Sequence, residues 1–238
     1  MRRLLSKREK IQVRLAAVEQ LIAIKKHYKY RELEKELGIP ASVLARYIKG
    51  GMAPSPYRAL EIMRKIRQLG YTEKILEKNL IRDPRGFLNM SQTLHDPSIV
   101  KLLAYTVLLE ETGWNKVLSL DLDSIPLASL IASVTNSFLI VCSRERRVGG
   151  DHVEEVFFTD SPPFVAALYV PAGAVGKGDR ILITTSVLRT GRTVEAAINL
   201  VSRLGGEISE IVVVASVGEA WKPRLKRFMD KIRVMARF

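Results

Sequence analysis

The residues with the clearest chemical potential join a strand to a helix in the last third of this 238-residue sequence. Apolar residues from Arg180 to Thr184 predict a buried strand, and Arg192 to Leu204 has the apolar spacing of a helix. Free backbone amides and the dipole at a helix N-terminus bind anions. We therefore predict that the loop that opens this helix can bind an anion.

This segment resembles the phosphoribosyl-pyrophosphate (PRPP) motif of the type I phosphoribosyltransferases. In that family an apolar strand ends in two acidic residues that hold the ribose hydroxyls, and a loop ending in Thr-Gly-x-Thr cradles the 5′-phosphate. Leu188 to Thr193 matches the phosphate loop, whereas Thr185 and Ser186 stand where the acids belong. The resemblance implies a domain that has kept the phosphate site and lost the ribose clamp. The phosphate-binding residues that it implies are Thr185, Ser186, Leu188, Arg189, Thr190, Gly191, Arg192 and Thr193. We therefore expect no enzymatic activity, no catalytic residues and no cofactor.

Two other segments bear on anion binding. Asp123 to Ala128 resembles the pyrophosphate loop of orotate phosphoribosyltransferases, in which glycines precede Ile-Pro, but Asp123 replaces one of those glycines. A carboxylate ~4 Å from a phosphate charge costs on the order of 4 kcal/mol at an effective dielectric of 20, so we expect poor pyrophosphate binding. Arg144, Arg146 and Arg147 follow another strand, where they either meet an anion or form a solvated cationic strand end.

The elements that position these residues alternate between strand and helix after Gly113. Such alternation predicts an α/β fold with a mostly parallel sheet covered on both faces, and ligands bind beyond the carboxyl ends of its strands. The expected strands are Lys116 to Leu120, Phe138 to Cys142, Phe164 to Tyr169, Arg180 to Thr184, Glu210 to Ala215 and Ile232 to Phe238. The expected helices are Pro126 to Thr135, Arg192 to Leu204 and Pro223 to Asp230.

The N-terminal third is predicted to be all-helical. A capping box, Ser6 to Glu9, opens a first helix from Lys7 to His27. The segment Tyr30 to Gly50 resembles a helix-turn-helix, because Leu33 and Leu37 form an apolar pair before a glycine turn and a second short helix. Two further helices, Tyr57 to Leu69 and Thr72 to Ile81, complete this domain.

The second helix of the helix-turn-helix is the expected DNA-reading element. Its buried side is predicted to hold Ile39, Leu44 and Ile48, and its outer side the residues that enter a major groove. The predicted DNA-binding residues are Ser42, Val43, Arg46 and Lys49, with Tyr47 at the edge. Residues 1–78 hold 19 lysines and arginines against 8 acidic residues, a net charge of +11, whereas residues 79–238 have a net charge of +2. A basic domain beside a nearly neutral one favours a polyanion partner.

Together the two parts resemble the archaeal transcription regulators of the GfcR type, in which a helix-turn-helix precedes an orotate-phosphoribosyltransferase-like domain. The resemblance implies a DNA-binding domain at residues 1–78 and a dimerisation and effector domain at residues 84–238. It also implies a homodimer that binds double-stranded DNA and senses a nucleotide or phosphate effector. Two alternatives stay open: an active orotate- or purine-type phosphoribosyltransferase with a nucleic-acid-binding extension, and a scaffold whose second domain binds nothing.

Several classes of function are not expected. The single cysteine, Cys142, lies in an apolar run and reads as a small buried hydrophobe, and the absence of a disulfide pair fits the cytoplasm. His27, His95 and His152 share no metal-ligand spacing, so we predict no metal site. No apolar run approaches the ~20 residues of a membrane span, so we expect no membrane contact.

Overall fold

The computed structural model describes residues 6–109, 113–146, 149–159 and 164–238, which form two compact units. The helical unit comprises Met1–Ile81 and Asp96–Glu110, and the α/β unit comprises Arg82–His95 and Glu111–Phe238. The sequence predicts a single boundary between the two domains, near Asp83 to Gly86. In the structure the chain enters the α/β unit at Arg82, returns to the helical unit at Asp96 and leaves it again.

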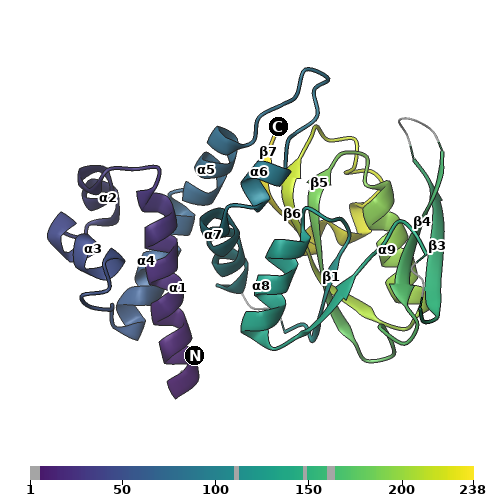
Figure 1. Cartoon of the computed structure of the whole chain (residues 1–238), viewed down its shortest axis with the longest axis horizontal. Helices are drawn as coiled ribbons and strands as arrows, with labels where there is room; N and C mark the ends of the chain where they lie inside the picture. Colours follow the sequence, from purple (N-terminus) through teal and green to yellow (C-terminus); the bar gives the residue numbers. More distant parts are fainter. Residues whose placement is uncertain (1–5, 110–112, 147–148, 160–163) are drawn as a thin grey trace. The chain divides into compact units, whose positions relative to one another are not determined.

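The helical unit is built from six helices within the described residues (Figure 1). The first helix starts at the expected capping box: Ser6 Oγ accepts a hydrogen bond from Glu9 N at 3.2 Å, and Glu9 Oε2 accepts one from Ser6 N at 2.7 Å. It ends two residues before the predicted His27. The bounds are α1 Lys7–Lys25, α2 Tyr30–Leu37, α3 Ala41–Ile48, α4 Pro56–Gln68, α5 Tyr71–Asn79 and α7 Pro97–Leu108.

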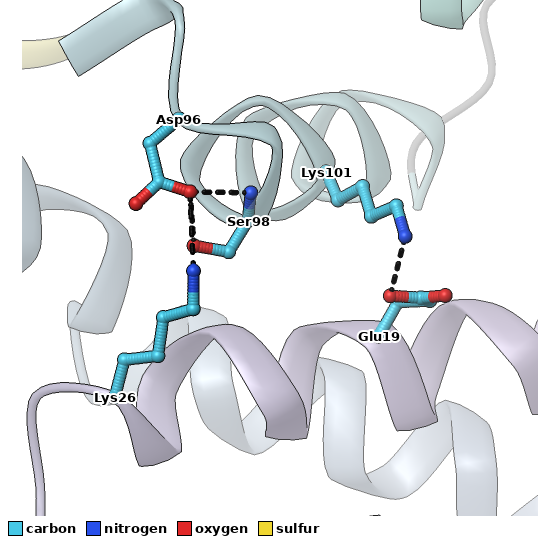
Figure 2. A network of polar contacts seen from close by, with 5 residues as sticks. All are labelled: Glu19, Lys26, Asp96, Ser98 and Lys101. Atoms are coloured by element: carbon cyan, nitrogen blue, oxygen red, sulfur yellow. Dashed lines mark hydrogen bonds and ion pairs between the residues drawn. The ribbon is translucent and has the colours of Figure 1, made fainter. Parts of the chain in front are cut away.

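The helix α7, which the apolar periodicity did not predict, packs against α1. Figure 2 shows two ion pairs between them: Lys26 Nζ lies 3.3 Å from Asp96 Oδ1, and Lys101 Nζ lies 2.9 Å from Glu19 Oε2. The Asp96 carboxylate also accepts hydrogen bonds from Ser98 N and Oγ, which caps the start of α7. These contacts, together with the buried apolar side chains of α7, join this helix to the helical unit.

The α/β unit contains a five-stranded parallel sheet in the order β2-β1-β5-β6-β7, and a separate antiparallel hairpin of β3 and β4 (Figure 1). The order reverses between β1 and β5, because β1 connects to β2 on one side and β5 to β6 on the other. Right-handed crossovers in opposite directions place α8 and α9 on opposite faces of the sheet. The bounds are β1 Lys116–Ser119, α8 Ile125–Thr135, β2 Phe138–Val141, β3 His152–Phe158, β4 Val165–Pro171, β5 Arg180–Leu188, α9 Arg192–Arg203, β6 Glu207–Ser216 and β7 Ile232–Arg237.

Three local differences from the predicted elements stand out in the α/β unit. The strand β3 was not predicted, and the short helix α6, Ser91–Leu94, was not predicted either. The expected helix from Pro223 to Asp230 is a 3-10 helix at Lys226–Lys231. The remaining expected strands and helices are confirmed, with ends shifted by a few residues.

The core of the α/β unit lies between the sheet, α9 and the hairpin. Its buried side chains include Leu118, Ile183, Val213, Leu168 and Val201. Cys142 is buried among them as predicted, and burial raises the pKa of its thiol to about 11. None of the helices described in residues 6–109, 113–146, 149–159 and 164–238 has the length and hydropathy of a bilayer span.

Candidate functional site

The loop between β5 and α9 forms one side of a pocket of about 300 Å³. The strand ends at Leu188, and α9 begins at Arg192 after a left-handed Gly191, whose φ is +81°. The N-terminal amides of α9 therefore border the pocket, as anion binding requires. The lining residues are Gly86, Phe87, Leu88, Val187, Leu188, Arg189, Thr190, Gly191, Arg192, Thr193, Val194 and Val217. Six of the eight residues predicted to bind phosphate are among them.

Gly191 sets the shape of this loop. A Cβ at this position would lie 3.3 Å from side-chain atoms of Leu225 and Trp221, and its positive φ is strained for other residues. The loop is also braced from one side by Arg224, whose Nε donates to the Thr190 carbonyl at 3.0 Å and whose Nη1 pairs with Glu195 at 2.8 Å. The backbone that would bind an anion is thus fixed by the fold before any ligand arrives.

Arg144, which follows β2, reaches the first turn of α9. Its Nη2 donates a hydrogen bond to Thr193 Oγ1 at 3.1 Å, and its guanidinium lies 5.1 Å from the centre of the Phe157 ring. Burial lowers the pKa of Arg144, and the nearby Cys142 and Asp121 oppose this shift. The structure therefore brings Arg144 to the loop. Arg144 and Arg146 are both exposed, and Arg147 lies outside the described residues.

Thr185 and Ser186, the other two residues predicted to bind phosphate, are buried in β5 and do not line the pocket. Both donate to the Asp121 carboxylate: Thr185 Oγ1 and Ser186 N each lie 2.9 Å from Asp121 Oδ2. Asp121 Oδ1 accepts a third hydrogen bond from Ser124 N at 2.9 Å. An acidic side chain from the neighbouring strand end thus lies against the two positions from which acids are missing.

The sequence contained one signal for Asp121. It follows directly after the expected strand Lys116 to Leu120, and parallel strands end at the same edge of a sheet. The register confirms this proximity, since Ser119 pairs with Thr184. Asp123, by contrast, accepts a hydrogen bond from Ser91 Oγ at 3.1 Å and does not line the pocket.

The predicted DNA-binding residues lie on α3 in the helical unit, except Lys49, which caps the C-terminus of this helix. Ser42, Arg46 and Lys49 are exposed, and Val43 is partly buried. Tyr47 is only 7% exposed, so its predicted place at the edge of a DNA-reading surface is corrected: the ring packs into the core. It lies one helical turn after the buried Leu44, which puts both side chains on the same face.

The turn between α2 and α3 is held by two features. Gly38 ends α2 with a φ of +66°, which glycine adopts without strain. Lys65 Nζ donates to the Leu37 carbonyl at 2.8 Å and so satisfies a free carbonyl at the end of α2. Ile39 and Leu44 are buried as predicted, whereas Ile48 is only partly buried.

The part of the chain that the structure describes contains no group of three histidine, cysteine, aspartate or glutamate side chains placed to hold a metal ion.

No model of a protein family matches the chain. A hypoxanthine/guanine phosphoribosyltransferase from Methanopyrus kandleri is 28% identical over 155 residues, which cover 61% of this chain and 80% of that protein. A protein named as probable purine biosynthesis transcriptional regulator PurR, from Streptococcus pneumoniae, is 23% identical over 175 residues, covering 71% of this chain and 60% of the regulator.

Solved structures similar to the chain are adenine phosphoribosyltransferases. The enzyme from Rhodothermus marinus superposes with a TM-score of 0.61 at 20% identity, covering 71% of this chain and 99% of the enzyme. The enzyme from Trypanosoma brucei, solved with AMP, pyrophosphate and ribose 5-phosphate, has a TM-score of 0.62 at 15% identity, covering 70% and 79%. None of these similarities identifies α2 and α3 as a helix-turn-helix or the chain as a regulator of the GfcR type.

These comparisons contradict the prediction that the chain is not an enzyme, because phosphoribosyltransferases predominate among the similar proteins. The prediction rested on the acids of one strand only. In the structure Thr185 and Ser186 contact a carboxylate from another segment, that of Asp121, which follows β1. The chain therefore contains a type I phosphoribosyltransferase-like α/β fold.

Proposed function

We propose that the α/β unit binds the 5′-phosphate of PRPP at the Leu188 to Thr193 loop and transfers the phosphoribosyl group to a purine base. A bond forms between C1′ and a ring nitrogen of the base, the C1′–O bond of PRPP breaks, pyrophosphate leaves, and the ring nitrogen releases its proton to solvent. The observation that carries this proposal is the loop itself, which Gly191 shapes, which opens α9 and which borders a pocket of about 300 Å³. The purine class comes from the names of the similar proteins, which are hypoxanthine/guanine and adenine phosphoribosyltransferases.

The charges around the loop support a phosphate ligand. The α9 amides, the hydroxyls of Thr190 and Thr193, and the Arg144 guanidinium, which contacts Thr193, can each donate a hydrogen bond to a phosphate without a change of protonation. Preorganised donors of this kind lower the cost of ordering a site when the ligand binds.

The Asp121 carboxylate supports the transfer step less directly. It supplies negative charge beside the end of β5, where the resemblance places the ribose-binding acids. With three of about four acceptor positions occupied by Thr185, Ser186 and Ser124, it has room for about one more donor. We therefore expect a weaker hold on the ribose than a pair of carboxylates gives.

The proposal is tested by incubating the full chain with adenine, hypoxanthine or guanine, PRPP and magnesium, and separating any nucleotide by chromatography. We expect product with at least one base and a large loss in Thr193→Val, which removes a pocket hydroxyl. Arg227→Gln, an exposed change in the 3-10 helix, is the matched control. Absence of product with all three bases contradicts the transfer activity.

A second function is supported by two specific observations. The similarity to the PurR regulator extends over 71% of this chain, and Arg46 and Lys49 are exposed on α3 in the basic N-terminal region. We propose that α2 and α3 act as a helix-turn-helix that binds double-stranded DNA as part of a homodimer, with a phosphorylated ligand of the α/β unit as effector.

DNA binding is tested by selecting bound fragments from genomic DNA with the full chain and then titrating the selected duplex. Arg46→Ala is expected to cost about 1 to 3 kcal/mol if Arg46 contacts a base, while Lys49→Ala mainly reduces the salt dependence. Sedimentation tests the dimer. Affinity that does not change with salt contradicts a phosphate-backbone interface.

A further inference from the structure

Phe87 contacts a cation of the phosphate loop. The Arg189 guanidinium carbon lies 5.0 Å from the centre of the Phe87 ring, and the Arg85 guanidinium carbon lies 6.0 Å from it. Phe87 and Arg189 line the same pocket. The ring is 48% exposed, so its place is not explained by burial in the core.

The backbone around Phe87 holds the ring in place. Asp83 Oδ1 accepts hydrogen bonds from Phe87 N at 2.8 Å and from Arg85 N at 2.9 Å, and Asp83 N donates to the Phe87 carbonyl at 2.7 Å. The bond from the Phe87 amide is the largest cause of a lowered pKa at Asp83. Because the hydrogen bonds fix the backbone of this turn, only the side-chain torsions of Phe87 remain to be restricted when a ligand binds.

We infer that Phe87 is a positioning residue that holds the Arg189 guanidinium in the wall of the pocket, where it serves as a cation for the phosphate group. The inference rests on the proposed phosphoribosyl binding, and it assigns a role to two side chains in addition to the backbone amides and hydroxyls of the loop. The ligand class is a phosphate monoester, because the Arg189 guanidinium adds positive charge to these donors.

The physical reason lies in the entropy of a long side chain. A solvated arginine loses rotamer freedom when an anion fixes it, and this cost opposes binding. A cation–π contact formed in the free protein restricts the side chain beforehand. The contribution to affinity is that of an exposed cation–π pair, about two- to fivefold.

The test is a titration calorimetry series with ribose 5-phosphate on the full chain. Phe87→Leu keeps an apolar side chain but removes the π face, and we expect it to weaken binding about two- to fivefold. Phe87→Tyr keeps the π face and is expected to bind like the wild type. Arg85→Gln is the matched control, because its guanidinium is farther from the same ring and does not line the pocket.

A double-mutant cycle separates positioning from pocket shape. In an Arg189→Gln background, Phe87→Leu is expected to cause no further loss. An equal loss in both backgrounds, or unchanged affinity in Phe87→Leu, overturns the inference while leaving the proposed function in place. Failure of the wild type to bind ribose 5-phosphate at millimolar concentration overturns both. Thermal unfolding of each variant checks that the fold is retained.

Discussion

The helical unit and the α/β unit hold their candidate functional residues in different ways. On α3 the candidates are exposed side chains, above all Arg46 and Lys49, on a surface whose backbone is already satisfied within the helix. In the α/β unit the candidate is the backbone of a loop, shaped by Gly191 and braced by Arg224. The difference teaches that changes to the exposed side chains of α3 should leave the fold intact, whereas changes to the backbone of the loop should alter it.

Tyr47→Ala gives the largest expected effect and shows where the α3 surface ends. Because the ring is 7% exposed and packs in the core, we expect the free energy of unfolding to fall by about 3 to 5 kcal/mol. Arg46→Ala on the same helix should change it by no more than about 0.5 kcal/mol. Urea unfolding measures the stability of the two variants. Equal stability of both would contradict the packing of the Tyr47 ring in the core.

Gly191→Val breaks the loop geometry. We expect the affinity for ribose 5-phosphate to fall more than about tenfold and the stability to fall by about 1 to 3 kcal/mol, because of the positive φ and the contacts at 3.3 Å. Gly173→Val is the matched control, since its φ is +75° but its Cβ would meet no atom within 4 Å. Calorimetry and thermal unfolding should show a similar strain in both and a loss of binding only at Gly191.

The ion pairs of Figure 2 are expected to contribute little. Lys26→Met and Lys101→Met each remove one contact between α1 and α7, but the partners are partly exposed, with 50% and 38% of the lysine side chains accessible. We expect each change to cost at most about 1 kcal/mol in urea unfolding, and less at high salt. A loss above about 2 kcal/mol contradicts the view that apolar packing holds α7 in place.

The smallest expected effect is a pH dependence of the helical unit. Burial lowers the pKa of His27, with Asp96 opposing the shift and Lys78 and Lys26 adding to it. The unfolded chain then binds the proton more readily, so stability is full above the ordinary pKa near 6.5 and declines as the pH falls below it. His27→Gln should flatten this decline in unfolding measured between pH 5 and 7.5, and an identical slope in the variant would exclude His27 as its source.

Much of the sheet could be predicted from the sequence because β1, β2, β5 and β6 are apolar runs that a buried parallel strand requires. The strand β3 lacks this pattern, since Glu154 and Glu155 interrupt it and its hairpin leaves one face exposed. The helix α7 was missed for a different reason. It is buried on nearly all sides, so its sequence does not alternate between an apolar face and a polar face.

The site was predictable only where one continuous segment forms it. The loop from Leu188 to Thr193 is such a segment, and most of it lines the pocket. Asp121 and Phe87 are 60 or more residues away in sequence, and they reach this region through strand pairing and a turn that a pattern in one segment cannot encode. The orientation of Tyr47 was missed because its distance from the core depends on the packing of α3, not on its residue type.

Phosphate binding at the Leu188 to Thr193 loop is tested most directly by hydrogen exchange of the full chain with and without ribose 5-phosphate. We predict slower exchange of the amides from Arg189 to Val194, in Thr193→Val a weaker effect, and no protection of the α3 amides by direct contact with this ligand. Protection confined to the helical unit, or no change in the loop at saturating ligand, would contradict phosphate binding at this loop.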